Sequence, residues 1–295
     1  MRFSSSRLHL PHSKFQQGVT LIEMLVGIII GLLVVAVAMG ALMVSRSVTG
    51  TVSDSSMLQQ QASYAFRVMG QQLRQAGSLR LNLAALKAEG AAIDMSDPVA
   101  FETKAEGFDP AVHTIGGLDA PGNNEYKLTV GYRNYKEPVY TSASNASMLR
   151  DCLGQAPNDN LIQSRFVLNA ATSELRCVGA SGTPQPIIQN VANFQVRYLW
   201  QTDVASGTPQ IRYVNAATVG TNWSQVVGVE ICLVLYGNEA IDIPSDTTTT
   251  AYIDCDGTDV KLSALATLPA PRARRAHVAF RSIYQLRSQG LISAS

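Results

Sequence analysis

Two absences shape the first third of this 295-residue sequence: it lacks proline over a long stretch and charge over a shorter one. No proline occurs between residues 12 and 97, so nothing in this region forces a helix to end. No charged residue occurs from residue 24 to residue 45, a run of twenty-two mostly apolar positions. At about 1.5 Å per residue, a helix of that length crosses a hydrocarbon core of roughly 30 Å. The sequence therefore predicts one membrane-spanning helix near its start.

Motifs that carry catalysis are also missing. The sequence has no Gly-x-Ser-x-Gly, no phosphate-binding loop and no His-Glu-x-x-His. Its four histidines do not cluster: they are His9, His12, His113 and His277. Because there is no Cys-x-x-Cys either, a zinc knuckle or thioredoxin-like centre is not expected. We therefore expect no enzymatic activity and no cofactor.

What the sequence does contain begins with a short basic leader. Residues 1–18 carry three basic side chains and no acid, and removing them leaves 20 basic and 22 acidic residues. By the positive-inside rule the leader stays cytoplasmic, and everything after Arg46 lies on the other side of the membrane. This balance of charge gives no reason to expect nucleic acid as a partner.

One carboxylate, Glu23, stands alone about one turn inside the apolar run. A lone acid in lipid costs up to a few kcal/mol, so it needs a partner or a function. Cleavage after Gly18 would create a positive α-amine on Val19, and this amine can face Glu23 of a staggered neighbouring chain. We therefore interpret Glu23 as a subunit-assembly residue.

The glycine, the four small or apolar residues and the glutamate at positions 18–23 resemble the type IV prepilin signature. The resemblance implies that a membrane prepilin peptidase cuts after Gly18 and that Val19 becomes N-methylated. One departure is that Val19 stands where the family usually has phenylalanine. The alternative is an ordinary secretory signal with a signal-peptidase site at residues 36–38, which would leave Met39 as the mature terminus. The acid and the excess length argue against it.

After the span, the apolar residues recur at threes and fours, which indicates a continuing amphipathic helix. We expect one helix of about fifty-eight residues from Val19 to Ala76, with Gly77 as its C-cap. The predicted domains are a leader (1–18), the transmembrane half of the helix (19–45), its amphipathic half (46–77) and a β-rich head (78–295). Gly27-x-x-x-Gly31 in the span fits close helix packing, but these glycines can equally be tolerated without that role.

The head alternates between turn signals and short strand-like segments. Residues 78 to about 125 read as loops with one short helix around Leu81–Lys87, and residues 180–186 and 247–250 read as exposed loops. The expected strands are Tyr126–Tyr132, Ser164–Leu168, Leu175–Val178, Phe194–Trp200, Val226–Tyr236 and His277–Leu286. A long helix followed by an antiparallel sheet predicts an α+β, pilin-like fold.

The head also resembles the PilW family of minor pilins. The resemblance is carried by the segments Asp151–Gly154, Glu174–Cys177, Val191–Tyr198, Trp223 with Val226–Glu230, and Arg272–Arg287. It implies a low-copy subunit that primes the pilus and sits at its tip with other minor pilins, joined to the major pilin. A J-type pseudopilin of type II secretion shares this architecture and is the first alternative. A tip adhesin or DNA receptor is the second.

Four cysteines lie on the oxidising side of the membrane. Of the three possible pairings, we favour Cys152 with Cys177 and Cys232 with Cys255, because neighbour pairing closes two loops of similar length. Buried free thiols are the alternative.

Two charged clusters in the head are weaker candidates. Asp254, Asp256 and Asp259 could offer oxygen ligands to calcium, although the ligand order of an EF-hand is missing, and a turn held by Cys255 is the simpler account. The arginines at 272, 274, 275, 281 and 287 could contact phosphates, but no alternating aromatic residues accompany them to stack bases. A solvated loop leading into a strand explains them better.

Overall fold

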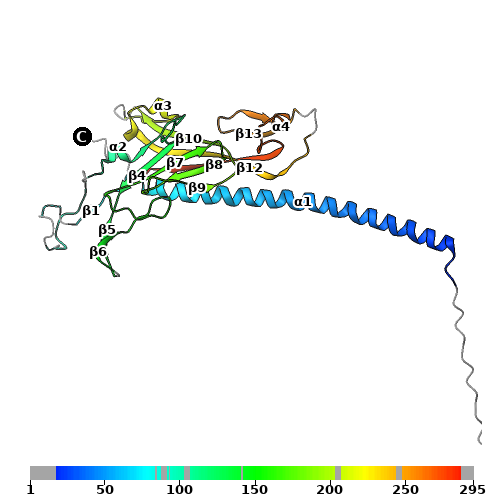
Figure 1. Cartoon of the computed structure of the whole chain (residues 1–295). Helices are drawn as coiled ribbons and strands as arrows, with labels where there is room; N and C mark the ends of the chain where they lie inside the picture. The colour runs from blue at the N-terminus through cyan, green and yellow to red at the C-terminus, as the bar shows by residue number, and fades with distance from the viewer. Residues whose placement is uncertain are drawn as a thin grey trace, which may run out of the picture. The chain divides into compact units, whose positions relative to one another are not determined.

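The computed structural model describes residues 18–83, 85–87, 92, 94–102, 107–140, 142–202, 207–243 and 248–286 (Figure 1). The chain forms two compact units, with the boundary between Val52 and Ser53. The first unit contains the start of a long helix. The second contains the remainder of that helix and all of the strands.

The helix α1 covers Leu21–Gln75, two residues short of the predicted start and one short of the predicted end. Its end follows the predicted C-cap: Gly77 has a φ of 69°, a left-handed conformation that glycine adopts without a steric penalty. The N–H of Gly77 then donates to the carbonyl of Gly131 at 2.9 Å, which attaches the end of the helix to the sheet beneath it.

Two antiparallel sheets form the body of the head. The larger has the strand order β3-β4-β7-β8-β9 and the smaller β11-β10-β12-β15. The first consists of β3 (Ile115–Gly116), β4 (Leu128–Arg133), β7 (Leu161–Asn169), β8 (Glu174–Val178) and β9 (Pro184–Ile188). The second consists of β10 (Val191–Thr202), β11 (Gln210–Val214), β12 (Val226–Ala240) and β15 (Arg275–Gln285).

Smaller elements decorate these sheets. Three two-stranded ribbons pair β1 with β2, β5 with β6 and β13 with β14. Their bounds are Leu81–Asn82, Ala100–Phe101, Lys136–Val139, Ser142–Ser147, Thr250–Ile253 and Asp259–Lys261. The short helices are α2 (Pro110–His113), α3 (Ala216–Val219), α4 (Leu262–Ala266) and the 3-10 turn Trp223–Gln225.

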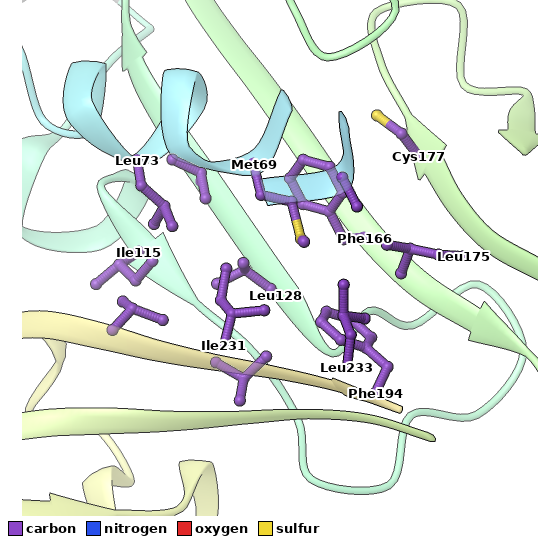
Figure 2. Packing of buried hydrophobic residues seen from close by; sticks show 14 of the residues in the cluster. Met69, Leu73, Ile115, Leu128, Phe166, Leu175, Cys177, Phe194, Ile231 and Leu233 are labelled. Atoms are coloured by element: carbon purple, nitrogen blue, oxygen red, sulfur yellow. The ribbon is translucent and has the colours of Figure 1, made fainter. Parts of the chain in front are cut away.

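The core lies where the second-unit part of α1 meets both sheets. Figure 2 shows Met69 and Leu73 of the helix beside residues of both sheets, and both side chains are fully buried. The apolar stripe of the helix is Leu58, Ala62, Ala65, Met69, Leu73 and Ala76, at the predicted spacing of threes and fours. Phe166 contributes from the larger sheet and Ile231 from the smaller one. Each large side chain buried here contributes about 1.5–3 kcal/mol, which explains why helix and sheets form one unit.

Polar contacts fix the rotation of the helix on the sheets. The amide oxygen of Gln72 accepts from the Tyr132 hydroxyl at 2.7 Å and the Ser164 hydroxyl at 2.9 Å, and all three side chains are buried. Nearer the unit boundary, the buried carboxylate of Asp54 accepts from the N–H of Glu239 at 2.7 Å. Satisfied polar groups of this kind specify one register of packing, because rotating the helix would leave them unpaired.

Some predictions for the head were wrong. The helix expected around Leu81–Lys87 is absent from the residues described there: β1 begins at Leu81 and pairs with Phe101 of β2, and residues 85–87 form a turn. The expected loops at 180–186 and 247–250 run into β9 and β13 respectively, and residue 247 lies outside the described residues. β9 was missed because Pro184 and Pro186 argue against a strand. An edge position tolerates them, since one side of the strand has no ladder to complete.

Candidate processing and assembly sites

The start of α1 is a capping box. Thr20 lies just before the helix, and the carboxylate of Glu23 accepts from the Thr20 backbone N–H at 3.2 Å and from its hydroxyl at 3.1 Å. In return, the Glu23 N–H donates to the Thr20 hydroxyl at 3.4 Å. These bonds satisfy groups that a helix start leaves unpaired. Glu23 therefore has hydrogen-bond partners within its own chain and is not the lone acid that the sequence analysis predicts. The Thr-x-x-Glu pattern of a capping box is nevertheless present in the sequence.

The candidate cleavage site lies immediately before this cap. Residues 18–20 carry no regular secondary structure, and Val19 is exposed. A Cβ placed on Gly18 would meet no atom of the described residues within 4 Å. The described part of the fold therefore has no steric need for glycine at this position.

The first 23 residues of α1, Leu21–Met43, are long and apolar enough to cross a membrane, with a mean hydropathy of 2.9. None of the window is buried in the described structure. Gly27 and Gly31 have open space around them, so a second helix could approach their face closely. A helix that is apolar on all sides requires lipid or other apolar helices around it.

Both disulfides join the neighbours favoured by the sequence. Cys152 pairs with Cys177 on β8, with a Cα–Cα distance of 6.4 Å, and Cys232 on β12 pairs with Cys255, with a Cα–Cα distance of 5.7 Å. They close sequence separations of 25 and 23 residues. A disulfide that closes a loop of this size restricts the unfolded chain, and this loss of entropy stabilises the fold by roughly 3 kcal/mol for each bond. The second bond fastens the turn between β13 and β14 to the outer face of the smaller sheet.

Two of the aspartates near Cys255 accept hydrogen bonds in and around that turn. Asp254 accepts from the Asn193 amide at 2.9 Å, and Asp256 accepts from the Thr258 N–H at 2.9 Å and its hydroxyl at 2.7 Å. Asp259 begins β14. Among the residues that the structure describes, no three histidine, cysteine, aspartate or glutamate side chains gather in a way that could hold a metal ion. Hydrogen bonds in and around the turn thus account for the carboxylates of Asp254 and Asp256.

The arginine cluster does not act as a single group. Arg274 pairs with Asp242 at 3.1 Å, whereas Arg281 pairs with Glu230 at 3.3 Å and donates to the carbonyls of Cys255 and Asp254. Arg287 lies outside the described residues. At least two of these cations thus have intramolecular roles that compete with phosphate binding.

The histidines have separate structural surroundings. His113 accepts the Asp109 N–H at 2.8 Å within α2, and His9 and His12 lie outside the described residues. His277 is buried, stacks on the Tyr252 ring at 5.4 Å between centroids and lies 5.8 Å from the Tyr236 ring. Its Nδ1 lies 2.9 Å from the Arg275 carbonyl, while its buried Nε2 has no hydrogen-bond partner among the residues that the structure describes.

This environment predicts loss of stability in acid. Burial lowers the pKa of His277, and nearby Arg272 adds to the effect, although the Arg275 carbonyl and Asp254 oppose it. A histidine with a lowered folded pKa gives its full contribution above its unfolded pKa of about 6.5, and the contribution is lost as pH falls through the folded value. We expect the Tm of the full chain to fall more between pH 7.5 and pH 5 than that of His277→Phe, which keeps the ring stack. Equal falls in thermal melts would contradict this.

Two protein families match the chain. The family of type IV pilus-assembly protein W matches residues 156–288, a range that begins in the loop before β7 and includes all of β15. The prokaryotic N-terminal methylation motif matches residues 13–39, which contain Gly18, Val19 and the capping box. Both resemblances noted in the sequence are confirmed by these matches.

Among solved structures, a type IV-like pilin from Thermus thermophilus matches with 14% identity and a TM-score of 0.34. The match covers 79% of this chain and 98% of that pilin. At this level of similarity no residue role can be transferred. None of the curated proteins matches the chain.

Proposed function

We infer the role of this chain from its family: it is a PilW-type minor pilin with a prepilin methylation motif, and it acts in type IV pilus assembly. The family and the pilin-like fold are structural rather than enzymatic. The chain combines a methylation motif, an uncovered apolar helix and a head that matches this family. This combination is the observation that supports processing, membrane anchoring and assembly into a pilus.

We propose that prepilin peptidase cuts the chain after Gly18 and that Val19 becomes the N-methylated terminus. The bond between these residues lies outside the helix, where a peptidase can bind it as irregular chain. The capping bonds of Thr20 and Glu23 lie entirely on the product side of that bond, so cleavage leaves the helix start intact. No hydrogen bond of the cap has to break.

Before assembly, we propose, the apolar part of α1 anchors the chain in the inner membrane as a single pass, with the leader cytoplasmic and the head in the periplasm. The basic leader and the oxidised cysteines of the head support this orientation. On assembly, the helix exchanges lipid for the apolar helices of neighbouring subunits. An amine on Val19 would then lie within reach of a neighbour's Glu23.

We further propose that the subunit primes the pilus and remains at its tip with other minor pilins, above the major pilin. Deleting its gene should reduce surface pili by tenfold or more and leave type II secretion unchanged, and the intact gene should restore the number of pili. Loss of secretion with normal pili would instead indicate a J-type pseudopilin. Normal pilus number with loss of adhesion or DNA uptake would indicate a tip receptor. Counting pili by electron microscopy and assaying secreted enzymes distinguishes these outcomes.

A further inference from the structure

The smaller sheet has one face that is only half covered. Its inner face packs on α1 and the larger sheet, and part of its outer face lies under the β13–β14 ribbon, where Tyr252 stacks on His277 and Cys255 bonds to Cys232. Figure 1 shows β13 and α4 together at one end of the head. Toward β11 the described residues place no element over the outer face, and large side chains there are exposed.

We define the outer-face patch as Arg197, Leu199, Ile211, Tyr213 and Ile283. The strand register puts them on one side of the sheet: Leu199 is paired with Tyr213, and both Arg197 and Ile283 are paired with Glu230. The exposed fraction is 57% for Ile211, 49% for Tyr213 and 54% for Ile283. All three lie on strands of the second unit, so their exposure is not part of the apolar surface of the helix. Ile211 and Tyr213 on β11 and Ile283 on β15 lie on opposite sides of the Arg197–Glu230 pair. Exposed apolar and aromatic side chains that flank an arginine favour an interaction surface.

The guanidinium of Arg197 is fixed in position at the centre of the outer-face patch. Its Nη2 donates to both carboxylate oxygens of the buried Glu230, at 2.9 and 3.0 Å, and its guanidinium lies 5.2 Å over the Tyr213 ring. Its Nε and Nη1 donate to no other group among the described residues, and 42% of the side chain is exposed. The guanidinium is thus fixed in place while some of its donors remain available.

The local charge indicates what would bind there. Glu230 pairs with both Arg197 and Arg281, and Arg281 also lies near Asp256, so Arg197 is the cation of this patch that shares its anion and keeps donors available. An acidic group on a partner would complete this arrangement, while apolar side chains beside it would cover the isoleucines. Arginine and tyrosine, which meet here, are the residue types that most often dominate binding energy at interfaces. Two copies of the chain docking patch to patch would place one Arg197 against the other, which argues against a second copy.

We propose that the outer-face patch binds the head of another pilin subunit through a surface segment that carries a carboxylate between apolar side chains. The proposal rests on the assembly role inferred above. Binding through Arg197 would join the partner to Glu230 and, through Arg281, to the disulfide-fastened turn at Cys255. The contact would thus act on the rigid part of the head.

The test uses the full-length chain in piliated cells, with the photocrosslinking residue p-benzoylphenylalanine at Ile211 or at Ile253. Ile253 on β13 is 54% exposed and serves as the matched control. We expect position 211 to form an adduct with another pilin, at least fivefold more than position 253, and the crosslinked peptide to contain an acidic residue. No adduct at 211, an equal adduct at 253, or an adduct with a second copy or a non-pilin protein would overturn the proposal.

A charge variant provides the second test. With the crosslinker at Ile283, Ile211→Glu should lower the amount of adduct at least tenfold, because the new carboxylate repels the partner's carboxylate. The control Ile253→Glu should leave the amount of adduct unchanged. Both substituted positions are exposed, so the head should fold in each variant. If deleting the gene removes pili but Ile211→Glu leaves both the adduct and the pili unchanged, the patch proposal fails and the assembly role stands. If deletion leaves pili intact, both fail.

Discussion

Gly18→Val is expected to block maturation of the chain without disturbing its fold. A Cβ at position 18 meets no atom of the described residues within 4 Å, and Gly18 precedes both the helix and its cap. Any requirement for glycine must therefore come from the peptidase, whose pocket would have to accept a branched side chain in place of a hydrogen. Mismatches of a few carbon atoms in enzyme pockets lower turnover by about tenfold or more. We expect a comparable loss of the form beginning at Val19.

The matched control for this prediction is Gly40→Val, because Gly40 also has open space around it but lies within α1. Intact mass measurement of the full chain extracted from membranes distinguishes the forms. The control should mature normally, and Gly18→Val should retain residues 1–18. Normal maturation of Gly18→Val would exclude cleavage at this bond, and a mature chain beginning at Met39 would indicate an ordinary signal peptidase.

The long elements of this fold could be predicted from the sequence because each depends on a pattern within its own residues. The helix α1 was predicted to within two residues, since the absence of proline and the apolar spacing from Leu58 to Ala76 both specify helix. The strand β10 alternates apolar and polar residues and was found in the same way, with Phe194, Val196 and Tyr198 on the core side. In both cases the buried face can be read directly from the residues.

Elements that depend on distant partners could not be predicted. The ribbon of Leu81 with Phe101 has two residues a strand, too few for any periodicity, and forms because the head brings the two segments together. β11 was missed although it alternates polar and apolar residues, because five residues are too few for the alternation of Ile211 and Tyr213 with Gln210 and Arg212 to identify a strand by itself. The sheet face on which Ile211 and Tyr213 lie was missed with it. The pairing of Arg197 with Glu230 depends on the register between β10 and β12, and these two residues are 33 positions apart in the sequence.

Glu23 is the position where sequence and structure suggest different roles, and substitution can separate them. The sequence suggests an acid awaiting a neighbour's amine, while the structure gives the acid a capping role with Thr20. Glu23→Gln retains the cap, because glutamine also accepts hydrogen bonds in a capping box, and removes the charge. Thr20→Val removes the hydroxyl of the cap and retains the charge. The two variants are therefore complementary controls.

If the charge is what assembly requires, Glu23→Gln should be cleaved normally and enter pili at least about tenfold less than the wild-type chain, because a charge left unpaired among apolar helices costs about 3 kcal/mol. Thr20→Val should enter pili nearly normally, since a lost cap costs about 1 kcal/mol and the rest of α1 remains hydrogen bonded. Quantifying each variant by immunoblot in sheared pili and in membranes provides the measurement. Should Thr20→Val fail to enter pili while Glu23→Gln enters normally, the carboxylate serves only to start the helix, and the pairing with a neighbouring amine is wrong.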